Sequence, residues 1–216
     1  LDLTTTGDPV VSYYDHSGSG DLKVAVCGDN TCTTSTLTLV DNGPEDRGLF
    51  TSLQLATGNI PVIAYHSLTG GDLYLARCGD ATCTTSTISL VDSANNVGYD
   101  GISLQLDGSG FPIMSYYDST LTALKVAHCS DADCSGPINI EVVDNSGAVG
   151  QFSSMKWDGA AATISYYDAT NGALKIAYCQ DADCSSATIE TIDDAGDVGW
   201  DTSLELGSSY VSYYDV

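Results

Sequence analysis

The stretch PIMSYYDSTLTALKVAHCSDADC, residues 112–134, contains the features that decide the fold of this chain. Two runs rich in β-branched and aromatic residues are separated by a short Ser/Thr turn, and the second run ends at the first cysteine of a Cys-x4-Cys pair. Short runs of this composition, bounded by turn residues, are typical of β-strands. The stretch therefore predicts a β-hairpin that leads into a tight turn between two cysteines.

This stretch is repeated along the chain. Similar segments occupy residues 9–32, 61–83 and 162–184, and residues 210–215 repeat its first run once more. The cysteine pairs recur every 50 or 51 residues, a period that is typical of propellers and other arrays. Each interval also holds two further short apolar runs, one followed by an Asp and one of Leu-x-Leu form. No interval has the 3.6-residue periodicity of a helix.

The repeating unit is thus a set of four short strands. The SYYD-type strands have few polar positions, so we expect both of their faces to be covered, as neighbouring blades of a propeller would cover them. We predict an all-β, β-propeller-like array of four-stranded antiparallel blades, with four full repeats and an extra hairpin. The single repeat domain covers residues 1–216, with repeats at 1–50, 51–101, 102–151 and 152–201 and a partial fifth repeat at 202–216.

The two ends of the chain do not complement each other in this alignment. Leu1 and Leu3 align with Leu104 and Leu106, so the chain opens within a Leu-x-Leu strand, and it closes after a fifth SYYD-type strand. Two interpretations remain open: the residues are part of a longer array, or the unmatched hairpin pairs with another molecule through its free strand edges. Under the second interpretation, the assembly strands contain Leu1, Leu3, Tyr210, Val211 and Tyr213.

The eight cysteines form four pairs of one spacing: Cys27/Cys32, Cys78/Cys83, Cys129/Cys134 and Cys179/Cys184. Regular pairs of this kind indicate disulfides in a protein that is extracellular or on the cell surface. The alternative is a metal site, but zinc prefers closer cysteine spacing or added His ligands, and the three histidines occupy unrelated repeat positions. We expect one disulfide per blade, joining the end of the third strand to the start of the fourth. Each contributes about 2 kcal/mol because the closed loop is short.

The charge of the chain restricts its partners. Six basic residues stand against 29 acidic ones, and the net charge is −23. Nucleic acid is excluded because phosphate binding needs clustered Lys and Arg, and anionic membranes are disfavoured for the same reason. No apolar run is long enough to span a bilayer, so we expect no membrane insertion.

Each repeat carries an Asp followed six or seven residues later by a Gly, with an aromatic residue close by: Asp41/Gly48/Phe50, Asp92/Gly98/Tyr99, Asp144/Gly150/Phe152 and Asp193/Gly199/Trp200. These residues fit a structured loop in which Asp caps backbone N–H groups, Gly takes a positive φ and the aromatic residue wedges between blades. Alternatively, they bind Ca²⁺, which prefers several oxygen ligands. The candidate ligands are Asp41, Asp46, Asp193, Asp194 and Asp197, and we expect no other cofactor.

Charged pairs and tyrosines also recur in the predicted hairpins. The pairs Asp15/Lys23, Asp118/Lys125 and Asp168/Lys175 face each other, and in the second repeat both positions change, to His66 and Tyr74. We interpret them as cross-strand ion pairs worth about 0.2–1 kcal/mol each, rather than as catalytic pairs.

The 13 tyrosines could form sugar-stacking surfaces, although packing explains most of them. The Ser/Thr runs at 33–36 and 84–87 are candidates for O-linked sugars.

Three segments resemble a repeat that is widespread in secreted and cell-surface bacterial proteins: residues 196–204 (GDVGWDTSL), 164–168 (ISYYD) and 171–177 (NGALKIA). The repeat has the approximate form VGxxTSLxL…PxISYYDxxxGxLKxAxC, and the resemblance covers the whole chain. It implies a β-propeller-like fold and a location outside the cell. It brings no catalytic residue, because such proteins mostly lack an assigned activity.

Enzymatic motifs are absent from the sequence, which has no Gly-x-Ser-x-Gly, no HExxH and no phosphate loop. Sialidase-type propellers use clustered arginines, and this chain has only Arg47 and Arg77. Departures from the repeat are scattered over several copies. We therefore predict a non-enzymatic extracellular structural protein, without catalytic residues, that self-assembles through its terminal strands into a surface layer or filament. The alternatives are a glycan-binding adhesion module and a glycoside-processing enzyme that uses paired carboxylates.

Overall fold

The computed structural model describes residues 1–17, 20–205 and 210–216, and it confirms the predicted all-β fold. The 18 strands of these residues form four four-stranded antiparallel sheets and one two-stranded sheet, which we number as blades 1 to 5 in chain order. Within each complete blade the strands lie side by side in sequence order. The part of the chain that the structure describes holds no apolar helix long enough to cross a bilayer.

The blades have closely similar strand boundaries. Blade 1 consists of β1 (Asp2–Leu3), β2 (Pro9–Asp15), β3 (Asp21–Cys27) and β4 (Ser35–Asp41). Blade 2 consists of β5 (Arg47–Ala56), β6 (Ile60–Ser67), β7 (Asp72–Cys78) and β8 (Ser86–Asp92). Blade 3 consists of β9 (Val97–Leu106), β10 (Pro112–Asp118), β11 (Ala123–Cys129) and β12 (Ile138–Asp144). Blade 4 consists of β13 (Val149–Trp157), β14 (Ala162–Asp168), β15 (Ala173–Cys179) and β16 (Ala187–Asp193), and blade 5 of β17 (Val198–Glu205) and β18 (Tyr210–Asp215).

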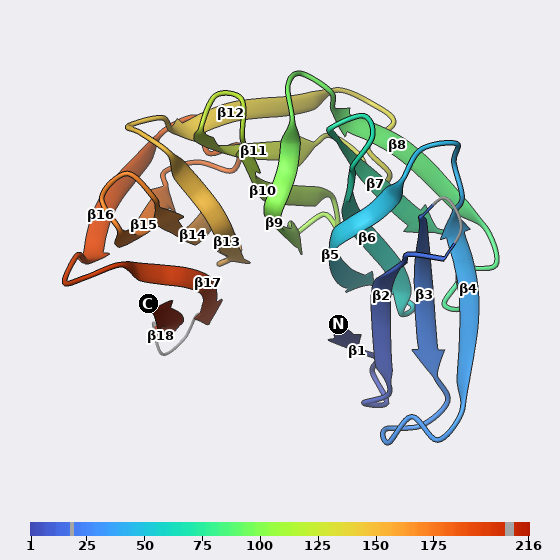
Figure 1. The fold of residues 1–216 in the computed structure, drawn as a ribbon. Coiled ribbons are helices and arrows are strands. Elements are labelled where there is room, and N and C mark those ends of the chain that lie inside the picture. The colour runs from blue at the N-terminus through green and yellow to red at the C-terminus, as the bar shows by residue number, and fades with distance from the viewer. Residues whose placement is uncertain (18–19, 206–209) are drawn as a thin grey trace.

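The blades are arranged in an open arc around a common axis (Figure 1). The first strand of each complete blade lies nearest the axis, and the fourth lies at the outer rim. The inner strands β5, β9, β13 and β17 contact one another in succession. In the view of Figure 1, β1 and the hairpin of blade 5 lie on opposite sides of the opening of the arc.

Apolar side chains fill the spaces between neighbouring blades. Three buried clusters join blades 1 and 2, blades 2 and 3, and blades 3 and 4. Tyr65, Tyr116 and Tyr166, each on the second strand of its blade, are fully buried between sheets. Full burial of a large apolar side chain contributes about 1.5–3 kcal/mol, so these interfaces supply much of the stability. The poor alternation of the SYYD-type strands is thus explained, because both of their faces are covered.

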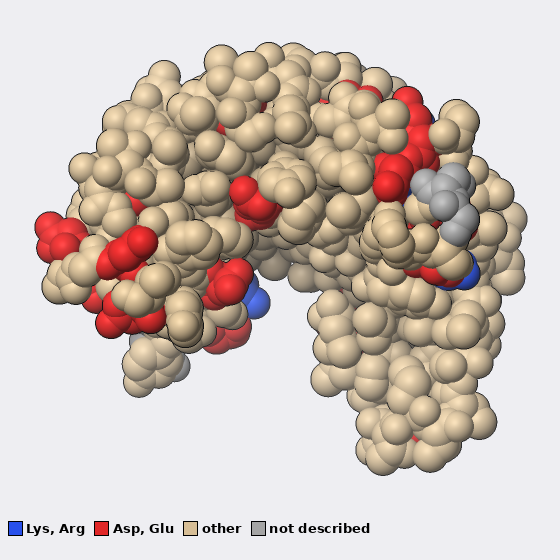
Figure 2. Space-filling view, in the orientation of Figure 1, with Lys and Arg blue, Asp and Glu red and all other residues tan. Residues whose placement is uncertain are grey.

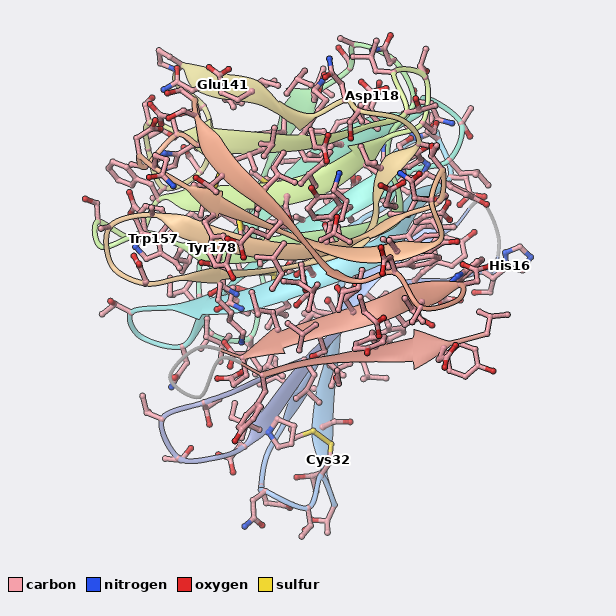
Figure 3. The ribbon with its side chains drawn as sticks, turned by 90° about the vertical axis from the view of Figure 1, so that its left-hand side faces the viewer. His16, Cys32, Asp118, Glu141, Trp157 and Tyr178 are labelled. Atoms are coloured by element: carbon pink, nitrogen blue, oxygen red, sulfur yellow. A yellow bond between two sulfur atoms is a disulfide. The ribbon has the colours of Figure 1, made fainter. Side chains whose placement is uncertain are left out.

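All four predicted disulfides are present, and each closes the turn after the third strand of its blade: Cys27–Cys32, Cys78–Cys83, Cys129–Cys134 and Cys179–Cys184. An Asp inside the turn supports it: in blade 4, Asp181 Oδ1 accepts the N–H groups of Asp183 and Ser185. Figure 3 shows the bridge at Cys32 near one extremity of the molecule. Four disulfides indicate a protein that matures outside the reducing cytosol.

The second cysteine of each pair lies outside the fourth strand, where we had expected it to begin that strand. In blades 2 to 4 the fourth strand begins three or more residues later, at Ser86, Ile138 and Ala187. The reason is the backbone, because the second cysteine of every pair has a φ between 54° and 57° and a strand needs negative φ values. The expected position is therefore corrected for all four residues, which are Cys32, Cys83, Cys134 and Cys184.

The bridges of blades 2 to 4 also do more than close a turn. Their second cysteines, Cys83, Cys134 and Cys184, are only 2%, 4% and 2% exposed, and each belongs to the apolar cluster that joins its blade to the preceding one. Cys32 of blade 1 is exposed, because the described chain holds no blade before blade 1. Three of the four bridges therefore contribute packing between blades in addition to closing a loop.

Repeated polar contacts tie each blade to the next. At the end of β8, Asp92 accepts a hydrogen bond from the Tyr116 hydroxyl (2.8 Å) and pairs with Lys125 Nζ (2.5 Å), both in blade 3. Lys125 Nζ lies 3.5 Å from Asp118, its predicted partner in the same hairpin. In the strand register Lys125 is opposite Tyr116, whereas Asp118 is opposite Ala123. The predicted pair exists, but the shorter contact joins two blades.

The seam between blades 3 and 4 repeats this arrangement. The Oδ2 atom of Asp144 accepts hydrogen bonds from the Tyr166 hydroxyl and from Lys175 Nζ, each at 2.7 Å. Burial alone raises the pKa of Asp144, but the hydrogen bonds from Lys175 and Tyr166 outweigh it, and the net pKa is lowered. Burial and the hydrogen bond to Asp144 raise the pKa of Tyr166. The seam therefore holds an ionised carboxylate and a neutral phenol.

The seam between blades 1 and 2 uses different residues for the same purpose. Tyr65 donates to Asp41 at 2.6 Å, but Tyr74 occupies the position that holds Lys in the other blades. The cation is instead Arg47, whose guanidinium lies 3.2 Å from Asp41 and 4.3 Å from the centre of the Tyr74 ring. An arginine from the inner strand thus replaces the missing lysine, which explains why blade 2 departs from the repeat pattern.

The inner strands are longer than the predicted Leu-x-Leu runs, and each contains a bulge. The strands β5, β9, β13 and β17 include the recurring Gly that we had expected in a loop. These glycines have positive φ as predicted, and a side chain on Gly150 would come within 2.6 Å of the Leu124 backbone. At this point the register between each inner strand and the second strand of its blade shifts. In β9 the shift lies between Val97 and Ile102. The bulges place the next residues of each strand at the candidate site.

Candidate functional site

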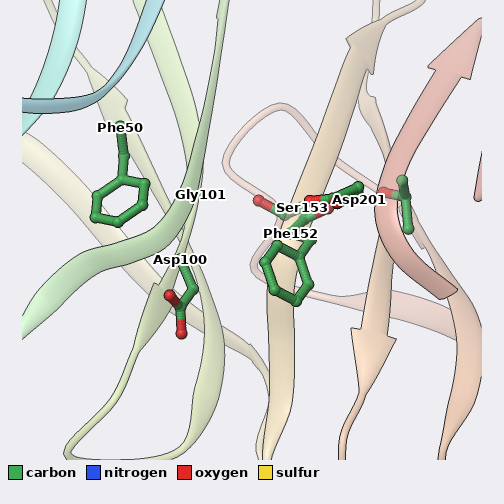
Figure 4. A pocket seen from close by; sticks show the side chains of 7 residues that line it. Phe50, Asp100, Gly101, Phe152, Ser153 and Asp201 are labelled. Atoms are coloured by element: carbon green, nitrogen blue, oxygen red, sulfur yellow. Dashed lines mark hydrogen bonds between the residues drawn. The ribbon is translucent and has the colours of Figure 1, made fainter. Parts of the chain in front are cut away.

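The bulges of the inner strands line a pocket that is built from several blades. It has a volume of about 310 Å³. Its lining residues come from blades 2 to 5 and are Phe50, Asp100, Gly101, Phe152, Ser153, Asp201 and Thr202 (Figure 4). Ligand pockets commonly measure about 300–1,000 Å³, so this one is large enough for a small sugar.

Four of the lining residues share an unusual backbone conformation. Phe50, Asp100, Phe152 and Asp201 have φ between 47° and 61°, a left-handed region that residues with side chains rarely adopt. Such a conformation costs about 1–3 kcal/mol per residue, and strained residues of this kind cluster at functional sites. One strained residue from each of blades 2 to 5 reaches this pocket, and for that reason we assign the candidate site here.

Two of the strained residues are carboxylates with different surroundings. Asp100 on β9 is partly buried, and its Oδ2 accepts a hydrogen bond from Gln151 Nε2 of blade 4 at 3.2 Å. Asp201 on β17 is exposed and faces solvent. The described lining contains no Lys or Arg, so the field in the pocket is negative.

Aromatic rings flank the carboxylates. Phe50 packs edge-on against Tyr99 with ring centres 5.0 Å apart, and Phe152 stacks on Trp200 at 5.2 Å. In the order of the blades, the strained residues alternate between Phe and Asp, and Figure 4 shows the side chain of Asp100 between the two Phe rings. Aromatic faces next to carboxylates suit sugar rings, because C–H faces pack on the aromatic ring while hydroxyls donate to the acids.

A buried histidine holds the Phe50 side of the pocket. The His66 ring lies 6.2 Å from the ring of Phe50 and 5.8 Å from that of Tyr99, and its Nδ1 is 2.8 Å from the carbonyl oxygen of Val97. Burial lowers the pKa of His66, so the ring is neutral and its Nδ1–H donates to that carbonyl. The aromatic wall is therefore fixed by a neutral, hydrogen-bonded residue and carries no positive charge.

A second hollow, whose lining includes the recurring Ser of the inner strands, has a structural role. Ser52, Ser103 and Ser154 each accept the backbone N–H of the next inner strand, at distances of 2.9–3.0 Å. These hydrogen bonds join neighbouring blades along the axis. The recurring Ser is thereby explained without a role in binding.

Most of the acidic residues predicted to bind calcium are hydrogen-bonded to tyrosines in the structure. Asp41, Asp46, Asp193 and Asp197 each accept a tyrosine hydroxyl, and Asp194 is exposed. The hydrogen bond to Asp46 raises the pKa of Tyr14 to about 12. Among the described residues, no group of three His, Cys, Asp or Glu side chains is arranged to hold a metal ion. Calcium binding by these loops stays a prediction.

The terminal strands that we expected to assemble lie at the surface. Leu1, Leu3, Tyr210 and Tyr213 are exposed, and Val211 is partly buried. Within residues 1–17, 20–205 and 210–216, β18 pairs with β17 alone. Self-association through these strands stays a prediction.

Sequence reasoning missed both carboxylates of the pocket. It identified Phe50 and Phe152 as recurring aromatic residues but placed them in a loop, and it did not single out Asp100 or Asp201. The available signal is the position two residues before the recurring Ser, which holds Phe50, Phe152 and Asp201. In blade 3 the additional residue Gly101 displaces Asp100 from this alignment.

Comparison with known proteins supports the fold. No family model matches the chain, and a search of curated proteins finds no match. A Penicillium chrysogenum α-L-arabinanase, solved with arabinobiose, has a TM-score of 0.59 at 13% identity, over 93% of this chain and 63% of its own. A GH43 β-1,3-galactosidase has a TM-score of 0.55 at 10% identity, over 96% of this chain and 46% of its own. A bifunctional GH43-CE protein of Bacteroides eggerthii has a TM-score of 0.51 at 10% identity, over 94% of this chain and 30% of its own.

These similarities establish a propeller-like fold and correct our functional prediction. The chain spans less than two thirds of the length of each of these proteins. We predicted a non-enzymatic structural protein that forms surface layers or filaments. That prediction is wrong, because the solved proteins that share the fold process glycosides. Scattered departures from the repeat had argued against an active site, but the pocket is lined by other residues, which blades 2 to 5 supply together.

Proposed function

We propose that this chain is a secreted or cell-surface glycoside hydrolase that binds a glycan in the pocket of the inner strands and cleaves a glycosidic bond there. One observation carries the proposal: two carboxylates and two aromatic rings, from four successive blades, converge on one pocket. The likeness of the fold to glycosidases supports it. The disulfides and the resemblance of the repeats to those of secreted and cell-surface bacterial proteins support the location.

The chemistry requires two carboxyl groups that flank the scissile bond. One donates a proton to the leaving oxygen, and the other activates a water molecule or attacks the sugar directly. Asp100 suits the second role, because the side-chain amide of Gln151 donates a hydrogen bond to its Oδ2 and so fixes the orientation of the carboxylate. Asp201, the other Asp of the pocket, is then assigned the role of proton donor.

The charge of the pocket indicates the class of glycan. Two Asp side chains without a basic residue in the described lining repel uronic acids and sulfated sugars, so we propose a neutral oligosaccharide. Phe50 and Phe152 offer a stacking face on each side of Asp100. Because the arabinanase of similar fold was solved with arabinobiose, arabino-oligosaccharides are the first substrates to test, followed by β-1,3-galacto-oligosaccharides.

We expect Asp100→Asn and Asp201→Asn to reduce the release of reducing sugar at least about 100-fold, the usual contribution of a positioned acid or base. Chromatography of the digested oligosaccharides measures this loss. Asp194→Asn is the matched control, because Asp194 is an exposed Asp outside the pocket, and it should keep full activity. Unchanged melting temperatures would show that the variants are folded.

Binding without cleavage would contradict the proposal. If calorimetry shows that the unmodified chain binds these oligosaccharides and chromatography shows no product after long incubation, the pocket is a binding site and the two Asp side chains are not catalytic. In an active enzyme, Phe152→Ala should raise KM more than it lowers kcat, since it removes a stacking face and leaves both carboxylates in place.

A further inference from the structure

Arg77 differs from the other basic residues of the chain. It lies near the end of β7 in blade 2 and is partly buried. Among the described residues, its guanidinium makes a single hydrogen bond, from Nη1 to the carbonyl oxygen of Ala132 in blade 3 at 3.3 Å. Within the same described residues every other Lys and Arg pairs with a carboxylate, namely Lys23, Arg47, Lys125, Lys156 and Lys175. Arginine presents several N–H donors in a planar fork, so most donors of Arg77 are available to a ligand.

Two hollows at the seam between blades 2 and 3 have Arg77 as a common lining residue. The first hollow, of about 370 Å³, lies between the disulfide turn of blade 2 and Asp133 of blade 3. The second, of about 360 Å³, lies between the turns that follow β5 and β9, and Leu55 and Leu106 form its apolar walls. Each hollow is large enough for a small ligand, and the exposed Ser109 opens the second one to solvent.

The seam between blades 3 and 4 shows the same position in a closed form. His128 corresponds to Arg77, because each directly precedes the first cysteine of its blade. The two ring nitrogens of His128 lie 2.8 Å and 3.3 Å from carboxylate oxygens. Trp157, at the strand position that holds Leu106 in blade 3, packs against His128 with ring centres 6.2 Å apart. At the seam of Arg77 the smaller leucine leaves a hollow, and the cation has no carboxylate partner in the described chain.

We propose that Arg77 and these two hollows form a second glycan-binding site, which holds a neutral sugar chain across the seam between blades 2 and 3. Carboxylates flank the guanidinium, with Asp133 in one hollow and Asp107 in the other. A sugar hydroxyl can accept a hydrogen bond from an Arg N–H while it donates one to a carboxylate. Leu55 and Leu106 offer an apolar surface to the C–H face of a sugar ring.

The carboxylate of Asp107 is already oriented for this role. Its Oδ1 accepts the backbone N–H groups of Ser109 and Phe111, each at 2.8 Å. Its Oδ2 lies 3.3 Å from Nε2 of His128. Because these contacts fix the side chain before a ligand arrives, little conformational entropy is lost when a sugar hydroxyl binds to it.

The charge around the site favours a neutral ligand over an acidic one. Arg77 contributes one positive charge, but Asp107 and Asp133 line the same hollows and the chain carries a net charge of −23. Figure 2 shows acidic residues at many places on one face of the molecule and few basic ones. A uronic acid or a sulfated sugar would be attracted by the guanidinium and repelled by the carboxylates on both sides of it.

The site is separate from the pocket of the inner strands. Phe50 of the pocket lies near the start of β5, whereas Arg77 lies near the end of β7. Since β5 and β7 are both antiparallel to β6, these residues occupy opposite ends of blade 2. Along blade 3, Asp100 of the pocket and Asp107 of the second hollow are roughly 20 Å apart in extended chain. The site would therefore retain a sugar chain without placing it at the carboxylates of the pocket.

An NMR titration of the folded 216-residue chain tests the proposal. The probes are arabino-oligosaccharides and β-1,3-galacto-oligosaccharides, and only this choice of sugars rests on the proposed function. The chain carries Asp100→Asn and Asp201→Asn, so that the probes are not cleaved during the titration. Backbone amides of residues 107–110 report on the second hollow, and the amide of Gly101 reports on the pocket.

We expect Arg77→Gln to weaken the binding reported by residues 107–110 at least about tenfold, since the loss of one charge-assisted hydrogen bond is sufficient for this change. The binding reported by Gly101 should stay the same. Lys23→Gln is the matched control, because it removes a positive charge outside both hollows, and it should keep the affinity. Melting temperatures show whether the variants are folded.

A second variant tests the hollow and leaves the cation in place. Leu106→Trp copies Trp157 of the closed seam, so the larger ring should fill the second hollow and weaken binding to a similar extent. If the folded Leu106→Trp chain binds the probes as tightly as before, the hollow is not the site and the proposal is wrong.

Two further results would overturn the proposal. One is the absence of shifts at residues 107–110 with about 10 mM of either neutral probe. The other is tighter binding of oligogalacturonate than of the neutral probes, weakened by NaCl, which would show a site for anions. Failure of the proposed hydrolysis is detected separately, by chromatography and by the shifts of Gly101, so the two proposals are tested independently.

Discussion

At the scale of single residues, the blades are held together by carboxylates that are buried with their donors. Asp92 and Lys125 are 4% and 5% exposed. Burial of a charge is tolerated only when the charge is paired and hydrogen-bonded, and removal of one partner leaves the other charge uncompensated. Each buried seam should therefore depend strongly on its cation.

We expect Lys125→Met to lower the free energy of unfolding by about 3–5 kcal/mol, because Asp92 loses its buried partner. The matched control is Lys23→Met, the same change at the equivalent position of blade 1. The side chain of Lys23 is 30% exposed and pairs with Asp15, so its loss should cost much less than the loss of Lys125. Urea unfolding of both variants measures the difference, and equal losses would contradict the buried-pair argument.

The residue pairs at the seams were only partly predictable. The sequence indicated that Asp118 and Lys125 belong together, because they flank one hairpin. It could not indicate that Asp92 is nearer to Lys125, since Asp92 lies 33 residues away in the preceding blade and no local pattern reports contacts between blades. For the same reason, Arg47 could not be identified as the substitute for lysine in blade 2.

At the scale of the strand, a bulge divides each inner strand into two parts. In β13, Gly150 has a φ of 108°, and two residues later Phe152 is in the left-handed region. The alternation of side chains is interrupted there, so sequence patterns detect only the second part of the strand. This is why the first part, with the Gly and the aromatic residue, was predicted to be a loop.

We expect Gly150→Ala to lower the free energy of unfolding by about 3–5 kcal/mol, because it combines backbone strain with overpacking. A Cβ at this position would lie 2.6 Å from the Leu124 Cα. Gly159→Ala is the control: Gly159 has a similar φ of 102°, and a Cβ there meets nothing within 4 Å. It should cost about 1–2 kcal/mol, and thermal unfolding that shows equal losses would refute the role of the close approach.

At the scale of the whole molecule, the repeat period predicted the array of blades and the disulfides, because each repeat contains the pattern for its own blade. The pocket is different, since no repeat contains it. Asp100 and Asp201 belong to blades 3 and 5, and they share one site only because the inner strands converge. A composite site of this kind cannot be read from one repeat at a time.

The net charge of −23 should make stability depend on salt. Raising NaCl from about 0.01 M to about 1 M shortens the screening length from about 30 Å to about 3 Å and relieves repulsion among the acidic residues. We expect the melting temperature to rise by about 2–4 °C for each kcal/mol of repulsion relieved. CaCl₂ at equal ionic strength is the comparison: a larger rise would indicate calcium bound by the acidic loops, and no rise in NaCl would exclude the repulsion argument.

The alternation of Phe50, Asp100, Phe152 and Asp201 has a consequence for how such molecules diversify. Each blade supplies one side chain to the pocket, and the bulge rather than that side chain sets its position. The buried ion pairs between blades involve other residues, such as Asp144 and Lys175. Specificity can therefore evolve through single replacements at these four positions, while the buried ion pairs between the blades are retained.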